Sequence, residues 1–215
     1  MKLALKDPIS GLTHFVGALL AVAGLVLLVV FGYMEGTAWH VVSFAIFGAS
    51  MILLYTASTL YHWLPLGEKG SAIMRRIDHM MIYVLIAGTY TPVCLVAIRG
   101  GWGWSLFGSI WGLAIAGIVL KIFWLDAPRW LATSFYLFMG WLAVVAFYPL
   151  IHSVPIGGIF WLVFGGILYS IGAVIYAVKK PNLHRHFGFH EIFHLFVMAG
   201  SFSHFLLMWR YILKL

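Results

Sequence analysis

The feature that most constrains the fold of this chain is a repeated apolar run, each copy long enough to cross a lipid bilayer. A helix needs about 20 consecutive apolar residues to span the hydrocarbon core. Runs of this length cover residues 11–33, 39–64, 74–98, 104–124, 130–150, 156–178 and 189–213. Only 9% of the residues are charged, against about 25% in an average soluble domain. The sequence therefore predicts an all-α integral membrane protein, a bundle of seven transmembrane helices.

Short polar segments separate the runs, and none is long enough to link two domains. They contain residues typical of turns, as in Glu35-Gly36 and Lys179-Lys180-Pro181. The basic lead before residue 11 resembles a signal peptide, but the apolar run that follows exceeds the roughly 7–15 residues of such a signal. We therefore interpret this run as the first transmembrane helix and expect residues 1–215 to form one domain.

The basic residues predict the orientation of the bundle. If the spans alternate in direction, ten of the 13 Lys and Arg residues fall at the end that holds the N-terminus. These ten are Lys2, Lys6, Lys69, Arg75, Arg76, Lys121, Arg129, Lys179, Lys180 and Arg185, and the other three are Arg99, Arg210 and Lys214. Because positively charged loops stay in the cytoplasm, we expect a cytoplasmic N-terminus and an external C-terminus, in a multi-pass protein of the cell membrane. The partner predicted for such a protein is lipid and not nucleic acid.

Several ionisable residues lie inside these apolar runs, where they are costly and therefore indicate a functional site. His190 and His194 are four residues apart, so their rings lie on one face of the last helix and suit one metal ion. His62 ends the second run and Asp78 begins the third, which places both at the same cytoplasmic depth as the pair. With Cys94 as the one cysteine, the ligands must be histidine or carboxylate. We predict a metal site of His62, His190 and His194 with Asp78 beside it.

The predicted ligands indicate hydrolytic chemistry. Three imidazoles leave the fourth position of a zinc ion open for water, as in catalytic zinc sites. Zinc lowers the pKa of this water from 15.7 to about 7, so that it can attack an acyl carbon. Asp78 would hydrogen-bond the water or orient a ligand, and Ser58, one turn deeper than His62, would donate a hydrogen bond to the oxyanion.

Asp78 and Ser58 also have simpler explanations. Asp78 could form a surface ion pair with Arg75 or Arg76. Ser58 could allow close helix packing, or donate a hydrogen bond to the carbonyl four residues earlier in its own helix.

The remaining histidines are predicted to lie outside the ligand set. His14, at the entry of the first helix, could support a ligand. His204 lies about 15 Å beyond His194 along the helix and cannot share its ion. We expect it to border an internal polar cavity with Thr89, Tyr90 or Thr91. No role is predicted for surface or loop residues His79, His184 and His186, or for His40 and His152 at the other end of the bundle.

The combination of Ser58, His62, Asp78, His190 and His194 resembles the hemolysin III branch of the progestin and adiponectin receptor (PAQR) family. The resemblance covers essentially the whole chain, including Pro8-Ile9-Ser10-Gly11-Leu12-Thr13-His14 and Gly88-Thr89-Tyr90-Thr91-Pro92. It implies that the three histidines bind Zn²⁺, that Asp78 contacts the zinc-bound water and that Ser58 belongs to the site. Related ceramidase-like proteins hydrolyse lipid amides, and the bacterial branch is named for haemolysis and linked to membrane homeostasis. A zinc-dependent hydrolase of a lipid amide or ester is therefore implied. Hormone-receptor function is not implied, because eukaryotic members have a long polar N-terminal region, whereas here only about ten residues precede the first span.

Two alternatives remain open at this point. His190-Glu191-Ile192-Phe193-His194 matches the H-E-x-x-H pattern of metalloproteases, in which the glutamate is the general base. Such a protease needs a third ligand that is usually acidic and later in the chain, and no acidic residue follows Glu191. Glu191 is also suited to complement the positive end of a helix dipole. The second alternative is a sensor of the membrane state or a cytolytic protein in which zinc is structural.

Overall fold

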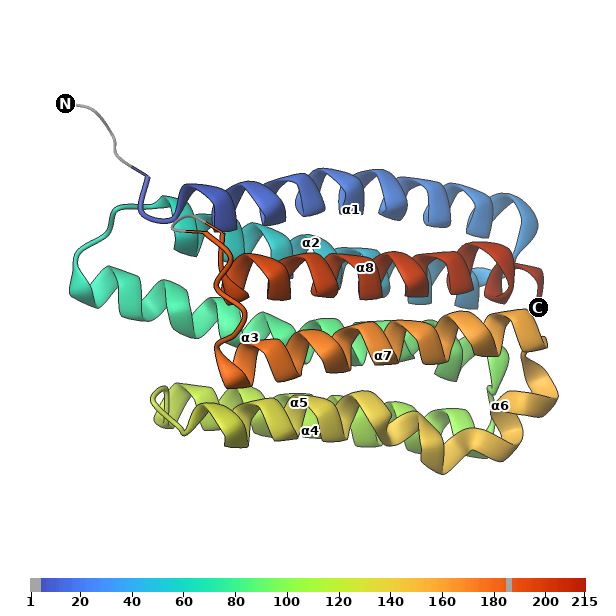
Figure 1. Cartoon of the computed structure of the whole chain (residues 1–215). Coiled ribbons are helices and arrows are strands. Elements are labelled where there is room, and N and C mark those ends of the chain that lie inside the picture. Colours follow the sequence, from blue (N-terminus) through green and yellow to red (C-terminus); the bar gives the residue numbers. More distant parts are fainter. Residues whose placement is uncertain (1–4, 185–186) are drawn as a thin grey trace.

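The computed structural model describes residues 5–184 and 187–215, which form a bundle of long helices running side by side (Figure 1). The α-helices are α1 (Pro8–Glu35), α2 (Ala38–Trp63), α3 (Glu68–Pro92), α4 (Gly101–Phe123), α5 (Arg129–Trp141), α6 (Phe147–Ser153), α7 (Ile156–Val178) and α8 (Phe189–Arg210). Three short helices, η1 (Val93–Ala97), η2 (Leu142–Ala146) and η3 (Ile212–Lys214), extend or connect them. Within the described ranges, seven helical segments are long and apolar enough to cross a membrane. The predicted fold class is confirmed.

The fifth membrane segment is less regular than the sequence predicts. It consists of α5, a 3₁₀ turn in η2 and the short α6. The hydroxyl of Tyr90 lies 2.9 and 2.7 Å from the carbonyl oxygens of Met139 and Gly140 and accepts a hydrogen bond from the amide of Ala143 at 2.8 Å. A side chain inserted into the backbone hydrogen-bond ladder interrupts a helix. Tyr90 of α3 therefore explains the interruption, which no local sequence signal predicts.

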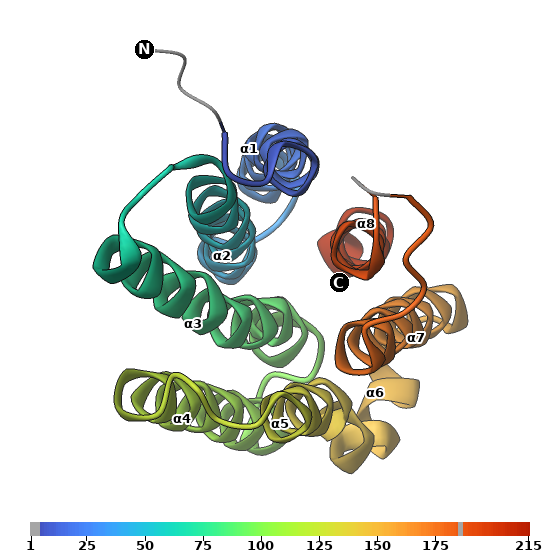
Figure 2. The ribbon, with the colours of Figure 1, turned by 60° about the vertical axis from the view of Figure 1, so that its left-hand side comes forward.

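The helices follow one another around the bundle, and the last one returns to the first. Figure 2 shows α8 between α1 and α7, and α8 packs against both of these helices. Side chains from the two ends of the sequence are thereby brought together.

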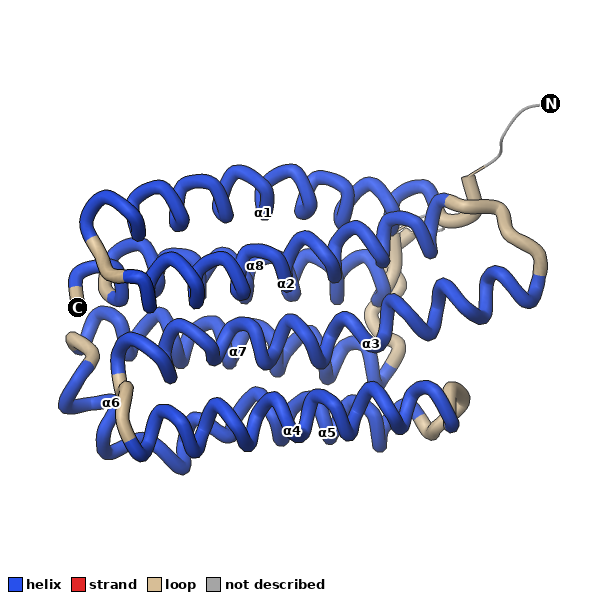
Figure 3. Tube along the Cα trace, turned by 180° about the vertical axis from the view of Figure 1, so that it is seen from behind, coloured by secondary structure: helices blue, strands red, loops and turns tan. Residues whose placement is uncertain are grey.

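The connections alternate between the two ends of the bundle, as the predicted topology requires. The N-terminal segment and the α2–α3, α4–α5 and α7–α8 connections share one end, while the C-terminus lies at the other (Figures 1 and 3). Among the ten basic residues assigned to the first end, Lys2 and Arg185 lie outside the described residues. The cytoplasmic location of this end stays a prediction.

The outer surface of the bundle is apolar, as expected for contact with lipid. Large side chains such as Leu20, Phe123 and Ile156 are 62, 84 and 83% exposed. The interior instead holds buried polar side chains, including His14, His62 and Asp78, all less than 9% exposed. The structure therefore places these ionisable groups inward, where they can form a site.

Candidate metal site

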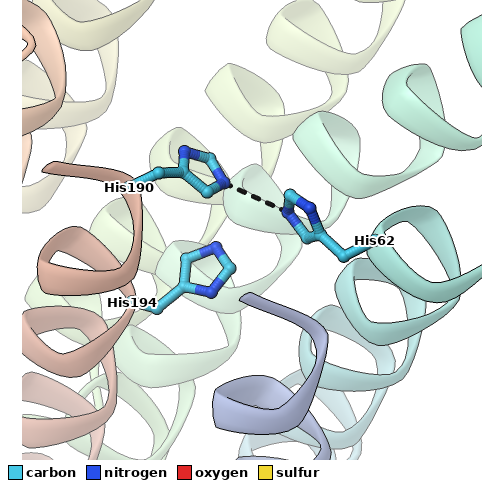
Figure 4. A group of neighbouring side chains, drawn as sticks. All are labelled: His62, His190 and His194. Carbon is cyan, nitrogen blue, oxygen red and sulfur yellow. Dashed lines mark hydrogen bonds between the residues drawn. The ribbon is translucent and has the colours of Figure 1, made fainter. Parts of the chain in front are cut away.

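Three histidines from α2 and α8 bring their ring nitrogens together at the N-terminal end of the bundle. A ring nitrogen of each of His62, His190 and His194 lies within 4.8 Å of the others. Figure 4 shows the rings of His62 and His190 facing each other, and their Nε2 atoms are 3.1 Å apart. Ligand nitrogens of a tetrahedral zinc ion at 2.0–2.1 Å are separated by about 3.3 Å. The His62–His190 distance matches this value, and the nitrogen of His194 lies within 4.8 Å of both. The three predicted ligands are therefore close enough together to fit one zinc ion.

The beginning of α1 orients His62. Asp7 lies directly before α1, but its side chain does not cap that helix. Instead, Nδ1 of His62 donates a hydrogen bond to Oδ2 of Asp7 at 3.1 Å, and the Asp7 amide donates to the His62 carbonyl at 2.8 Å. A proton held on Nδ1 leaves the lone pair of Nε2 free for a metal, an arrangement common around zinc-binding histidines.

The first turns of α1 orient His194 in the same way. Nδ1 of His194 lies 3.2 Å from the carbonyl oxygen of Ser10 and 3.0 Å from the hydroxyl of Thr13. The Thr13 hydroxyl itself donates to the Ser10 carbonyl at 2.8 Å, so it accepts from His194. Both contacts hold the Nδ1 proton and leave Nε2 for the metal. Asp7, Ser10 and Thr13 are supporting residues that the sequence analysis did not predict. Asp7 could have been recognised as a carboxylate at the same membrane depth as His62.

His14 contacts a predicted ligand, as expected for a supporting residue. Its ring stacks on that of His194, with centroids 3.6 Å apart and an interplanar angle of 10°. Neither ring nitrogen has a hydrogen-bond partner among the described residues. Its support for His194 comes through this ring contact, not a hydrogen bond.

Glu191 is occupied by structural contacts. One carboxylate oxygen accepts a hydrogen bond from the Gly188 amide at 2.8 Å, which closes the first turn of α8. The other oxygen accepts a hydrogen bond from the Ser10 hydroxyl. These contacts support the interpretation of Glu191 as a residue that stabilises the helix N-terminus. They leave the general base of the protease pattern without support.

Asp78 and Ser58 line the same cavity as His190 and His194. Asp78 is 8% exposed, and within the described residues it forms no ion pair with Arg75 or Arg76. Arg75 instead binds Asp126 at 2.7 Å. The hydroxyl of Ser58 neighbours the Asp78 carboxylate and has no hydrogen-bond partner within the described part of the chain. It therefore does not bond the carbonyl of its own helix. The catalytic roles of both residues stay predictions.

The expectation that His79 lies at the surface is wrong. Because α3 begins at Glu68, six residues earlier than predicted, His79 lies about three turns inside the helix. Its Nε2 is 3.4 Å from the Tyr176 hydroxyl, and the residue lines the cavity. His184 is exposed in the α7–α8 connection, as expected, and His186 lies outside the described residues.

The histidines expected away from the ligand set are placed at other points of the bundle. His204 lines the cavity together with Thr89 and Tyr90 as predicted, but the wall of this cavity is largely apolar and not polar. The Nε2 of His204 donates to the Leu162 carbonyl at 3.2 Å. His40, at the start of α2, contacts the carbonyl of Ile212 in η3 near the C-terminus. His152 in α6 contacts the carbonyl of its own helix neighbour Tyr148.

The cavity has a volume of about 500 Å³ and is bordered chiefly by α3, α5, α7 and α8. This size lies in the range of about 300–1,000 Å³ found for small-molecule sites. Beyond the histidines its wall is largely apolar, with side chains such as Ile82, Leu85 and Val93. Asp78 and Val93, both on this wall, are about 20 Å apart along the helix at about 1.5 Å per residue. The space therefore suits an elongated amphiphile with its polar end at the histidines.

Comparison with known proteins gives similarity over nearly the whole chain. A family model described as Haemolysin-III related matches residues 3–205. The chain is 44% identical over 211 residues to the Hemolysin-3 homolog of Bacillus subtilis (strain 168), which covers 98% of the chain and 96% of that protein. It is 42% identical over 206 residues to Hemolysin-3 of Bacillus cereus, a match that covers 95% of the chain and 90% of that protein. The Monocyte to macrophage differentiation factor of Homo sapiens is 24% identical over 183 residues, a match that covers 82% of the chain and 73% of that protein.

Proposed function

The chain belongs to the Haemolysin-III related family, and from this premise we propose that it is a zinc-dependent hydrolase of a lipid amide or ester. The observation that carries the proposal is the group of three histidine rings, two of which, His190 and His194, line the polar end of a lipid-sized cavity. A buried carboxylate, Asp78, shares that cavity. Such a combination is the minimum that metal-assisted hydrolysis needs.

In this proposal His62, His190 and His194 hold the ion. When bound, zinc supplies a Lewis acid that polarises a carbonyl and acidifies water. Asp7 and the Ser10 carbonyl keep the ligand rings in the tautomer that leaves Nε2 unprotonated.

Asp78 and Ser58 handle the proton and the developing charge. The Asp78 carboxylate accepts a proton from the attacking water and returns it to the leaving amine or alcohol, as a general base and then a general acid. The unpartnered Ser58 hydroxyl donates a hydrogen bond to the oxyanion. The apolar wall holds the lipid chain and excludes bulk water from the reaction.

A second candidate function is non-enzymatic. The predicted ligands join α2 to α8, and their hydrogen bonds add the start of α1. A metal at this point would pin three helices together, which suits a protein that senses or perturbs the membrane. The relative from Bacillus cereus carries the name Hemolysin-3, which favours cytolysis within this candidate.

Metal analysis of the purified chain tests the site directly. We expect about one zinc ion per chain, and a loss of zinc in His62→Ala, His190→Ala and His194→Ala. His152→Ala, at an exposed position in α6, is the matched control and should keep the ion. Undiminished zinc in all three variants would contradict the ligand assignment.

Lipid turnover separates the two candidate functions. If the chain is a hydrolase, the zinc-loaded protein releases fatty acid from a lipid amide or ester, and Asp78→Ala abolishes this release while keeping zinc. If the zinc-loaded parent turns over no lipid across neutral and charged amides and esters, the hydrolase proposal fails and the structural role of zinc is favoured.

A further inference from the structure

One end of the cavity is lined by basic side chains that the proposed chemistry does not use. They are Arg75 of α3, Lys121 of α4, Arg129 of α5 and Lys179 after α7. Two acidic residues of the described chain line this end as well: Asp126, whose carboxylate is bound by Arg75 at 2.7 Å, and Asp78, about one turn beyond Arg75 on α3. The end of the cavity therefore carries an excess of positive charge.

Lys121 is the most informative of these residues because it is buried. It is 3% exposed, and its ammonium lies 3.5 Å from the carbonyl oxygen of Leu125, a long hydrogen bond. No carboxylate of the described residues lies within ion-pair distance of it. Asp126 acts on Lys121 electrostatically but is not within ion-pair distance. A buried charge without a close ion pair is costly, so this position is suited to an anion that enters the cavity.

A second observation points to the same ligand. His79 lines the cavity, and its Nδ1 is buried without a hydrogen-bond partner among the described residues. Arg75, Lys121 and Arg129 line the same cavity as His79, and we call these four side chains the basic cluster. A single oxyanion in the cluster would satisfy the His79 nitrogen and neutralise Lys121 together.

The topology alone does not explain this arrangement. Basic residues gather at the cytoplasmic end of membrane proteins, and exposed residues such as Lys69 fit that general tendency. The tendency does not require a lysine to be buried, or a histidine whose Nδ1 lacks a partner among the described residues to line the same cavity as three cations.

We propose that the basic cluster binds the oxyanion headgroup, a phosphate or a carboxylate, of an amphiphile whose chain lies along the apolar wall of the cavity. This assignment rests on the proposed function in one respect, that a lipid occupies the cavity. Arg75, Asp78 and His79 lie within about one turn of α3. The headgroup would thus be held within a turn of the predicted catalytic carboxylate, so the substrate class is an anionic lipid with its amide or ester close to the headgroup.

Equilibrium binding to the purified protein in neutral detergent tests the assignment with three probes. These are a single-chain alkyl phosphate, the alkyl alcohol of the same chain length and inorganic phosphate. We expect the alkyl phosphate to bind at least about tenfold more tightly than the alcohol, because hydrogen bonds to charged groups contribute about 1.5–3 kcal/mol. Inorganic phosphate should bind more weakly than the alkyl phosphate, since it lacks the chain.

Variants locate the binding. Lys121→Gln and Arg129→Gln should each weaken alkyl phosphate binding about tenfold or more, while alcohol binding stays at the parent value and reports an intact cavity. Lys69→Gln removes an exposed charge outside the cavity and should change nothing. If Lys121→Gln does not fold, Arg129→Gln carries the test.

Three results would overturn the assignment. The first is equal affinity for alkyl phosphate and alcohol. The second is an equal loss of alkyl phosphate affinity in Lys69→Gln and Lys121→Gln. The third is equal affinity for inorganic and alkyl phosphate, which would make free phosphate the ligand. Protein stripped of metal by a chelator should keep its preference for the alkyl phosphate. Failure of the zinc or hydrolase proposal is thereby distinguished from failure of this one.

Discussion

Nδ1 of His62, near the end of α2, lies 3.1 Å from a carboxylate oxygen of Asp7, which directly precedes α1. Only one ring nitrogen of His62 thus remains for a metal. This ties the geometry of a predicted ligand to the docking of the first residues of the bundle.

Asp7→Asn should weaken zinc binding about 10–100-fold, the range seen when a hydrogen-bond partner of a ligand histidine is lost. Competition with a chelator of known zinc affinity measures the change. Glu68→Gln, which alters an exposed acid at the same end of the bundle, is the control. If Asp7 had only a structural role, its replacement would lower the thermal stability of the metal-free protein. We instead expect the metal-free variant to unfold at the parent temperature. Parent-like zinc affinity in Asp7→Asn would remove Asp7 from the site.

Asp78→Asn should lower lipid hydrolysis by about 10²-fold or more, since general acid–base catalysis contributes about 10²–10⁴-fold. Zinc content should be unchanged, because Asp78 lies outside the group of three predicted metal ligands. Turnover and metal content are measured on the same preparation. Loss of zinc together with activity would instead make Asp78 part of the metal's coordination.

Ser58→Ala should reduce turnover with little effect on stability, because among the described residues the hydroxyl makes no close hydrogen bond and its one polar neighbour is the Asp78 carboxylate. Removing one oxyanion donor costs about 10²–10³-fold in rate. Ser43→Ala is a matched control in α2, where the buried hydroxyl bonds the His40 carbonyl at the opposite end of the helix. Equal turnover in the two variants would argue against an oxyanion role for Ser58.

Tyr90→Phe should destabilise the bundle without touching the metal ligands. The Ala143 amide would lose its hydrogen-bond partner, at a cost of about 1–3 kcal/mol for a buried unsatisfied group. Thermal unfolding in detergent measures the loss. Tyr148→Phe, at a position 71% exposed, is the control and should unfold at the parent temperature. Similar unfolding temperatures for the two variants would contradict the assignment of the helix interruption at η2 to Tyr90.

Gly88→Ala should destabilise the contact between α2 and α3. A Cβ at this position would lie 2.3 Å from Oγ and 2.6 Å from Cβ of Ser50, and overpacking of this kind costs about 1–3 kcal/mol. At Gly112 in α4 an added Cβ meets no heavy atom of the described residues within 4 Å. Gly112→Ala should therefore unfold at the parent temperature or above. If Gly88→Ala is equally stable, the Ser50 side chain can move aside without a loss of stability, and the prediction is wrong.

The parts of the structure that follow from local patterns could be predicted from the sequence. Apolar run length defines each span, and the span from 156 to 178 agrees with α7 residue for residue. The grouping of His62 with His190 and His194 followed from helical periodicity and membrane depth, which need no knowledge of helix packing.

The missed features depend on which helices touch. The bonds from Asp7 to His62 and from Ser10 to His194 require α1 to dock against α2 and α8 in one register. The inward position of His79 and the insertion of Tyr90 into the fifth segment likewise depend on contacts between distant helices. No local pattern in the sequence encodes such contacts.

The return of α8 to the side of α1 sets the order in which the site can form during synthesis. His190 and His194 are made last, and their helix must enter the membrane and reach α1 and α2 before a metal can be held. A chain that stalls or is cleaved before α8 therefore lacks two of the three predicted ligands. If the site binds zinc as proposed, loading with metal would mark the end of membrane insertion, and the metal-bound fraction would report how many chains have completed biogenesis.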